Sequence, residues 1–328
     1  MNLSCFRGRR TLITGGVGFI GSNLARRLLD LGAVVTLVDS LIPEYGGNLF
    51  SIQGIEDHIR LNISDVRDEH GMKHLVQGQD TLFNLAGQTS HMDSMALPYT
   101  DMDINCRAQL SILEACRHFN PTIKVIYAST RQIYGRPEHL PVDELHPIRP
   151  VDINGINKWA GEAYHILYNN VYGIRTCALR LTNTYGPRMR IKDARQTFVG
   201  VWIRRLLEGL PFEVWGGEQL RDFNYVDDCV EALLLAAMRE EVNGQAFNLG
   251  DRHPVSLLEL ADLLVKLNGC GSYSVHTFPP DRKKIDIGDY YSDFSKFEAV
   301  VGWMPKTDLE EGLARTLKYY RAHLNQYI

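Results

Sequence analysis

The sequence predicts an α/β protein with a doubly wound parallel sheet and a smaller C-terminal α/β lobe. Up to about residue 181, short runs rich in Val, Ile and Leu alternate with amphipathic helical stretches, which is the pattern of a parallel sheet covered on both faces. A glycine-rich turn directly follows the first of these runs. Beyond residue 181 the alternation loosens, and prolines, glycines and aromatic residues become more frequent. A chain of 328 residues exceeds one typical domain.

Six short runs supply the expected strands of the sheet. They are 11–14, 34–38, 59–61, 81–86, 123–128 and 176–181. Apolar residues at helical spacing predict helices over 104–119, 155–172 and 197–208. A further short strand is expected at 212–215. Two later helices begin at capping boxes, which pair Ser256 with Glu259 and Thr307 with Glu310.

The composition narrows the class of protein. Hydrophobic residues make up 45% and charged residues 23% of the chain, as in ordinary globular proteins. A net charge of −4 gives no reason to expect nucleic acid as a partner. The cysteines are scattered without a CxxC pair, which is typical of a reducing, cytoplasmic location.

Membrane and metal sites are not expected either. No apolar run approaches the ~18 residues of a membrane span, and no apolar segment follows the N-terminal arginines as it would in a signal peptide. His70 and His74 lie four residues apart, but no further ligand cluster accompanies them, so no metal is expected.

The glycine-rich turn covers residues 14–21 and lies between a strand-like run and a helical stretch. This context is the one that a dinucleotide-binding fingerprint requires. The glycines make the tight turn, let the backbone approach the pyrophosphate and let the helix pack on the sheet. The first N–H groups of that helix then hold the anion. We expect the cofactor to contact Gly15, Gly18, Phe19, Ile20 and Gly21.

The run at 34–38 ends in Asp39, at the place where a carboxylate reads the ribose 2′-hydroxyl of a bound dinucleotide. A carboxylate there repels the extra 2′-phosphate of NADP. The sequence therefore favours NAD over NADP as the cofactor.

Other residues of interest follow the later strands, because a doubly wound sheet binds its ligand at the carboxyl ends of its strands. The third strand is followed by Asp65 and Val66, and the fifth by residues 129–135. After the fourth come Leu85, Ala86, Gly87 and Gln88. The small residues among these permit the close approach of a flat cofactor.

Taken together, these motifs resemble the extended short-chain dehydrogenase/reductases that modify nucleotide-sugars, namely epimerases, 4,6-dehydratases and decarboxylases. The resemblance covers nearly the whole chain. The matching segments are TGGVGFIG at 14–21, Asp39, 65–66, 84–87, Asn105, 129–135, Lys158 with Glu162, 183–188, 221–228 and 247–250. It implies a Rossmann-type NAD-binding domain over 1–181 with roughly 225–250. The nucleotide-sugar-binding lobe would then comprise 182–224 and 251–328.

The resemblance also implies roles for individual residues. Asp65 and Val66 would lie at the adenine, and Lys158 would bond the nicotinamide ribose. Asn183, Arg221 and Arg282 would hold the diphosphate, a task that suits the planar fork of arginine. Further substrate contacts are expected from Gln88, Arg131 and Arg190. A salt bridge from Arg221 to Asp222 or Asp227 remains the alternative.

The family pattern breaks at its catalytic base, where a tyrosine usually stands four residues before the lysine. Here that position is Asn154, whose side chain can hydrogen-bond a hydroxyl but cannot accept its proton. We expect Thr130 to hold the reacting hydroxyl, Asn154 to orient it, and Lys158 to supply positive charge and stand as a candidate proton acceptor. His91, which has a suitable titration range, is an alternative acceptor.

A second departure concerns the dehydratases, in which an Asp-Glu pair follows the threonine and eliminates water. Arg131 and Gln132 occupy those positions, and neither is a carboxylic acid. Arg131 is instead suited to a phosphate or a carboxylate.

The expected activity is NAD-dependent epimerisation of a nucleoside-diphosphate sugar, as in UDP-glucose 4-epimerase, through transient oxidation at C4. Two alternatives stay open: a 4,6-dehydratase or other oxidoreductase, and a redox-silent protein that binds NAD or a sugar nucleotide. Because helices around 101–118 and 155–171 commonly pair between subunits in this family, a homodimer is expected.

Overall fold

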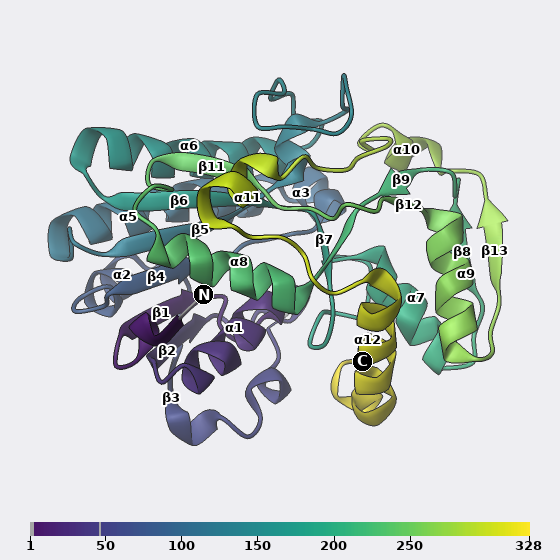
Figure 1. The fold of residues 1–328 in the computed structure, drawn as a ribbon, viewed down its shortest axis with the longest axis horizontal. Helices are drawn as coiled ribbons and strands as arrows, with labels where there is room; N and C mark the ends of the chain where they lie inside the picture. The colour runs from purple at the N-terminus through teal and green to yellow at the C-terminus, as the bar shows by residue number, and fades with distance from the viewer. Residues whose placement is uncertain (1–2, 46) are drawn as a thin grey trace.

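The computed structural model describes residues 3–45 and 47–328, and a seven-stranded parallel sheet forms its larger part (Figure 1). The strand order is β3-β2-β1-β4-β5-β6-β11. The strands are β1 (Arg10–Thr14), β2 (Val34–Asp39), β3 (Ile59–Ile63), β4 (Thr81–Asn84), β5 (Lys124–Thr130), β6 (Arg175–Leu181) and β11 (Gln245–Asn248). All neighbouring strands run parallel. Since the order reverses between β1 and β4, a crevice for ligands is expected there.

Helices cover both faces of this sheet (Figure 1). On one side α1 (Phe19–Asp30) packs beside α8 (Val226–Met238). On the other side lie α2 (Glu69–Leu75), α5 (Ala108–Phe119) and α6 (Ile153–Tyr172). Successive strand residues point to opposite faces, so Leu12 and Ile13 belong to two different hydrophobic clusters. The prediction of a doubly wound α/β fold is confirmed.

The remaining elements gather mostly to the right of the sheet in Figure 1, around α7 (Phe198–Leu207), α9 (Leu257–Asn268) and α12 (Leu309–His323). Strand β8 (Phe212–Trp215) pairs in parallel with β13 (Tyr273–His276). Shorter strand pairs are β7 (Asn183–Tyr185) with β10 (Phe223–Tyr225) and β9 (Leu220–Arg221) with β12 (Val255–Ser256). Short helices are α3 (His91–Ala96), α4 (Pro98–Met102), α10 (Pro280–Lys283) and α11 (Ser295–Val301). A π-helical turn covers Asp103–Arg107, and 3-10 turns cover Leu3–Phe6, Pro43–Tyr45, Leu49–Ile52, Glu56–His58, Arg131–Tyr134 and Leu324–Gln326.

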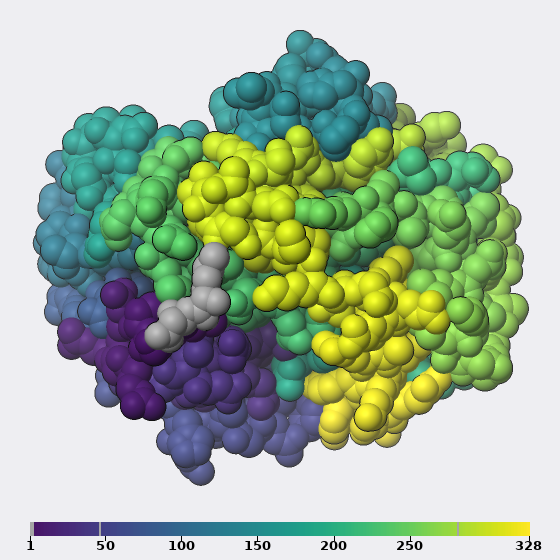
Figure 2. Space-filling model, viewed as in Figure 1, coloured from purple at the N-terminus to yellow at the C-terminus, as the bar shows by residue number. Residues whose placement is uncertain are grey.

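The connection between β5 and α6 rises above the rest of the molecule, in blue-teal at the top of Figure 2. It is tied to the C-terminal part because Val142 N–H donates to Tyr291 O at 2.9 Å, and Val142 O accepts from Asp293 N at 2.8 Å. A small hydrophobic cluster joins Ile133, Tyr134 and Val142 of this connection to Ile287 and Tyr290. The end of β5 is thereby joined to a segment more than 150 residues away.

Four of the predicted strands end at a different residue in the structure. The second and third run on to Asp39 and Ile63, and the fifth continues through Thr130. The fourth stops at Asn84, so that Leu85 and Ala86 lie in the following loop. In the region where a helix is expected over 104–119, α5 begins only at Ala108. The π-helical turn and α4 directly precede it.

One of the two predicted capping boxes is present. Ser256 Oγ accepts from Glu259 N at 3.1 Å, and Glu259 Oε2 accepts from Ser256 N at 2.7 Å. The prediction of a capping box at Thr307 is wrong. Asp308 is the N-cap of α12, and its carboxylate accepts a hydrogen bond from Glu311 N at 2.8 Å. No helix in the described part of the chain is long and apolar enough to cross a bilayer.

Candidate functional site

A cavity of about 1020 Å³ lies at the carboxyl ends of the sheet strands and is closed by residues of the C-terminal part. Its walls bring together every predicted site residue except Arg190. The cofactor set comprises Gly15, Gly18, Phe19, Ile20, Gly21, Asp39, Asp65, Val66, Leu85, Ala86, Gly87 and Lys158. The remaining predicted residues on its walls are Gln88, Thr130, Arg131, Asn154, Asn183, Arg221 and Arg282.

The glycine turn is shaped for close approach. Gly15 has φ +67°, and a Cβ on it would lie 3.0 Å from Ala86 N. A Cβ on Gly21 would collide with Gly15 O. Gly18 is the N-cap of α1 and provides no side-chain cap, so the first N–H groups of that helix remain for an anion. This cradle fits the pyrophosphate of a dinucleotide.

Two carboxylates lie beside this turn. Asp39 accepts hydrogen bonds from Val17 N at 3.1 Å and Leu41 N at 2.9 Å. Burial raises the pKa of Asp39, against the effect of these backbone bonds. Asp65 pairs with Arg67 at 2.6 Å, and this bond lowers the pKa of Asp65. Both groups therefore hold fixed positions on the cavity wall.

Lys158 is buried where α6 passes the end of β5. Its ammonium donates to Ala128 O at 2.5 Å and lies 4.3 Å from the centre of the Tyr127 ring. Burial lowers the pKa of Lys158 to about 8. A fraction of this side chain is thus neutral near physiological pH and able to take up a proton.

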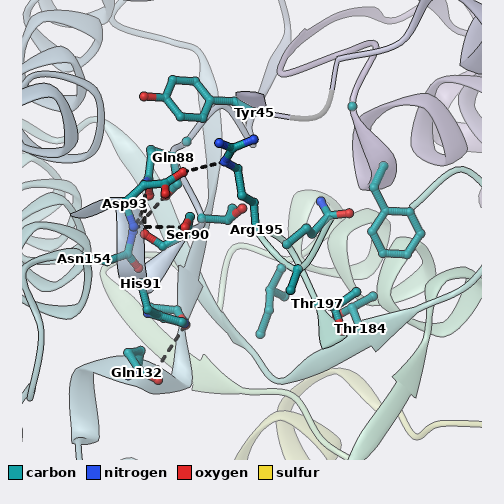
Figure 3. Close-up of a pocket in the computed structure, with 18 of the residues that line it drawn as sticks. Tyr45, Gln88, Ser90, His91, Asp93, Gln132, Asn154, Thr184, Arg195 and Thr197 are labelled. Carbon is teal, nitrogen blue, oxygen red and sulfur yellow. Dashed lines mark hydrogen bonds and ion pairs between the residues drawn. The ribbon is translucent and has the colours of Figure 1, made fainter. Parts of the chain in front are cut away.

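Asn154 is held by a network of amides around the buried carboxylate of Asp101. The Nδ2 of Asn154 donates to Asp101 Oδ2 at 3.0 Å and to Gln88 O at 2.8 Å. Asp101 also accepts from the Nδ2 atoms of Asn105 at 3.0 Å and Asn157 at 2.8 Å. In Figure 3 the oxygen of the Asn154 carboxamide lies away from Gln88, on the side of His91. Its amide group is therefore committed, while its oxygen remains an acceptor.

His91 forms a pair with Asp152, the N-cap of α6. The distance from His91 Nδ1 to Asp152 Oδ2 is 2.8 Å, and the Asp152 side chain is fully buried. Asp152 also accepts from Gln132 Nε2 at 2.8 Å and Gly155 N at 2.7 Å. Burial acts to raise the pKa of Asp152, but His91 and the other donors outweigh it and the pKa is lowered. His91, Gln132 and Asn154 face the same cavity (Figure 3).

The predicted diphosphate ligands, Asn183, Arg221 and Arg282, all come from the second half of the chain and line the same cavity. Arg221 is buried, and its Nη2 lies 3.3 Å from Asp286 Oδ1. Asp286 is thus its partner, rather than Asp222 or Asp227. Burial and the nearby Arg131 lower the pKa of Arg221 to about 10.

The other two predicted diphosphate ligands differ in freedom. Asn183 Nδ2 donates to Asp222 O at 3.0 Å. The Arg282 guanidinium is exposed and lies 4.4 Å from the Trp215 ring centre. Arg282 can therefore turn toward an anion more freely than Asn183.

The structure does not bring Arg190 to the cavity. Its guanidinium is bound to Asp193 at 2.6 Å and to Pro43 O at 2.5 Å. Arg195 lines the cavity and pairs with Asp93 at 2.8 Å, as Figure 3 shows. The sequence signal for Arg195 is that it stands close to three other basic residues, Arg188, Arg190 and Lys192. Sequence reasoning also missed Tyr45, which lines the cavity as well. No group of His, Cys, Asp and Glu among the described residues could hold a metal ion.

The fold and the glycine cradle agree with what the comparison with known proteins finds. The model of the NAD dependent epimerase/dehydratase family matches residues 11–250. The chain belongs to this family. NAD is accordingly its cofactor, and the cradle of Gly15, Gly18 and Gly21 fits it.

Relatives span nearly the full length of the chain. A putative UDP-glucose 4-epimerase of Methanocaldococcus jannaschii is 32% identical over 94% of this chain and 98% of its own. The structure of UDP-glucose 4-epimerase from Thermotoga maritima with UDP-glucose is 30% identical, with a TM-score of 0.87 over 96% of this chain and 99% of that one. The UDP-glucuronic acid 4-epimerase of Bacillus cereus, in complex with UDP-glucuronic acid and NAD, is 26% identical with a TM-score of 0.85 over 96% and 99%.

Proposed function

We propose that this protein epimerises a nucleoside-diphosphate sugar by oxidising it transiently at C4 and returning the hydride. The observation that carries the proposal is the single cavity that joins the glycine cradle to Thr130, Lys158 and Arg221. A ligand extending from the cradle to Arg221 passes the reactive side chains at the end of β5. The 1020 Å³ of the cavity is at the upper end of the usual range for ligand pockets, as two large ligands require.

The residues divide the chemistry as follows. NAD, when bound, supplies the acceptor for the hydride. The Thr130 hydroxyl and the Asn154 oxygen hold the sugar hydroxyl, and Lys158 takes up its proton. The hydrogen bond from Lys158 to Ala128 O keeps the ammonium at the end of β5, where it would also bond the nicotinamide ribose.

We further infer that Asn154 stands where related enzymes have their catalytic tyrosine. Its Nδ2 donates hydrogen bonds to Asp101 and Gln88, which hold this part of the cavity wall rigid. The side-chain oxygen is left to orient the substrate. A positioned general base typically contributes ~10²–10⁴-fold to a rate, and Lys158 replaces only part of what the tyrosine would contribute. We expect a slow enzyme for this reason.

A 4,6-dehydratase is the second candidate function, and the His91–Asp152 pair favours it. Asp152 of this pair accepts a hydrogen bond from Gln132. Gln132 occupies one of the two positions that carry the Asp-Glu pair in dehydratases. It would supply an acid–base group there.

The test incubates the protein in D₂O with UDP-, dTDP-, GDP- and CDP-sugars, after denaturation of a separate sample has identified the released nucleotide. We expect bound NAD and a new epimer without deuterium at C4, because the hydride returns from the cofactor. Loss of water with incorporated deuterium would show the dehydratase instead. Bound NAD with every sugar unchanged would contradict both and leave a binding protein.

We also propose the expected division of the chain and a homodimer. Residues 1–181 and roughly 225–250 would hold NAD, and the rest would hold the sugar nucleotide. Helix α6 exposes Ile156, Trp159, Leu167 and Val171 in one apolar stripe, beside Tyr99 of α4. Such a patch is typical of a helix-to-helix interface.

A further inference from the structure

Arg131 has a guanidinium without a partner. It forms no hydrogen bond or ion pair with any residue that the structure describes, and its Nε atom is shielded from solvent with no acceptor. The side chain lines the cavity. Since buried polar groups in proteins are nearly always bonded, a bare guanidinium requires an explanation.

Packing rather than charge holds Arg131 in place. It begins the turn that follows β5, directly after Thr130. Its guanidinium carbon lies 5.5 Å from the centre of the Tyr290 ring. Tyr290 is itself buried in the small cluster that includes Ile133, Tyr134 and Val142 of the β5–α6 connection. The side chain is therefore pre-organised beside an aromatic face, which tolerates a cation.

Nearby acids are already occupied. Asp222 accepts hydrogen bonds from Thr182 Oγ1 and, at 3.0 Å, from Ser292 N. Asp286 pairs with Arg221 at 3.3 Å. Arg221 is moreover a like charge close enough to disfavour a second cation. Burial without a direct counter-ion is unfavourable for the folded chain, so the ligand is the natural partner of Arg131.

We propose that Arg131 binds a carboxylate on the sugar, so that the substrate class is a nucleoside-diphosphate uronic acid. This inference rests on the proposed function and names its substrate. The predicted diphosphate ligands are Asn183, Arg221 and Arg282, whereas Arg131 adjoins the residue that holds the reacting hydroxyl. The planar fork of a guanidinium matches a carboxylate with two parallel hydrogen bonds.

The experiment measures binding by calorimetry in the presence of saturating NAD. The ligands are glucuronate and glucose derivatives of UDP, dTDP, GDP and CDP. The proteins are the parent, Arg131→Met, Arg131→Lys and the control Arg60→Met, which removes an exposed charge on β3 outside the cavity. For the nucleotide that binds best, we expect the glucuronate derivative to bind the parent at least ~30-fold more tightly than the glucose derivative.

Arg131→Met should remove that preference, Arg131→Lys should keep part of it, and Arg60→Met should leave it unchanged. Without ligand, Arg131→Met should melt at the same temperature as the parent or higher, because it removes an unpaired charge. A lower melting temperature would make Arg131 a structural residue and overturn the proposal.

Other outcomes separate this inference from the proposed function. An equal loss of affinity for both sugars would place Arg131 on the diphosphate and overturn the carboxylate assignment. Tight binding of the parent without preference for the acid would do the same and leave the proposed function intact. Failure of every nucleotide-sugar to bind the parent would contradict the proposed function itself.

Discussion

At the scale of single residues, Lys158 makes a prediction about pH. In the proposed mechanism a neutral Lys158 takes up the proton, so kcat/KM should rise with pH and level off above about 8. The positive charge of NAD can shift this limit only downward. Lys158→Met should abolish most of the activity, and the kcat/KM that remains should not increase with pH. Lys306→Met, an exposed position outside the cavity, serves as control. If His91→Asn rather than Lys158→Met removes the rise, the His91–Asp152 pair is the proton acceptor.

The same lysine affects stability with a definite sign. Burial lowers the pKa of Lys158 in the folded chain to about 8, whereas an unfolded lysine titrates near ~10.4. Between these values the unfolded chain binds more protons, so the free energy of unfolding gains a contribution that grows with pH. Chemical denaturation at pH 7 and 10 should show a smaller gain in Lys158→Met than in Lys306→Met. An equal gain would mean that the ammonium is solvated.

Asn154 allows a gain-of-function prediction. A tyrosine at this position supplies a group that can accept a proton once ionised, so Asn154→Tyr should raise kcat, by up to ~10²-fold. It should also lower the free energy of unfolding by about 1–3 kcal/mol, since Asp101 loses one of its amide donors and the larger ring must be packed. Steady-state kinetics and urea denaturation measure the two effects. A fall in kcat with intact folding would show that this chain depends on the asparagine.

At the scale of elements, α6 is anchored to the sheet by a buried ion pair. Glu162 of α6 and Arg180 of β6 are 2.6 Å apart, with side chains 5% and 6% exposed. Ser129 of β5 also donates to Glu162 at 2.5 Å. Glu162→Gln leaves Arg180 buried and unpaired, which should lower the free energy of unfolding by about 3–5 kcal/mol. Exchanging the exposed Glu310 for Gln provides the control. An unchanged midpoint of urea denaturation in Glu162→Gln would mean that water takes over the role of the Glu162 carboxylate beside Arg180.

The strands that are buried on both faces were predictable from the sequence. Most of the cavity residues that follow these strands were predictable for the same reason. Runs such as 34–38 are apolar except for Thr36, because both neighbouring layers are protein. The partner of Arg221 was not predictable, since Asp286 lies 65 positions later and is brought close only by the packing of the loops. Local competition explains two errors. Asp193, three residues away, captures Arg190, and Asp308 rather than Thr307 caps α12.

At the scale of the whole molecule, the C-terminus is tied to the segment that follows β2. Asn48 Nδ2 donates to Gln326 O at 2.7 Å, and Tyr327 lies 3.3 Å from Ser51 Oγ. The C-terminal stretch also crosses the face shown in Figure 2 from the sheet to the lobe. These bonds therefore fix the end of the chain against residues 48–51.

Assembly is the prediction that belongs to this scale. Trp159→Glu places a charge in the exposed stripe of α6, where the Trp159 side chain is 43% exposed in the single chain. Light scattering should show a dimer for the parent and a monomer for the variant, with unchanged circular dichroism. Val275→Glu, on exposed β13, should remain dimeric. A parent that is monomeric at high concentration would contradict the homodimer.

The most direct measurement follows the fluorescence of the reduced nicotinamide after rapid mixing with the sugar nucleotide that binds best. Transient oxidation at C4 predicts a rise in fluorescence followed by a decay to the initial level, with the epimer appearing during the decay. The rise should be slowed in Lys158→Met. Calorimetric binding of the same sugar nucleotide with no change in fluorescence and no product would contradict the proposed chemistry.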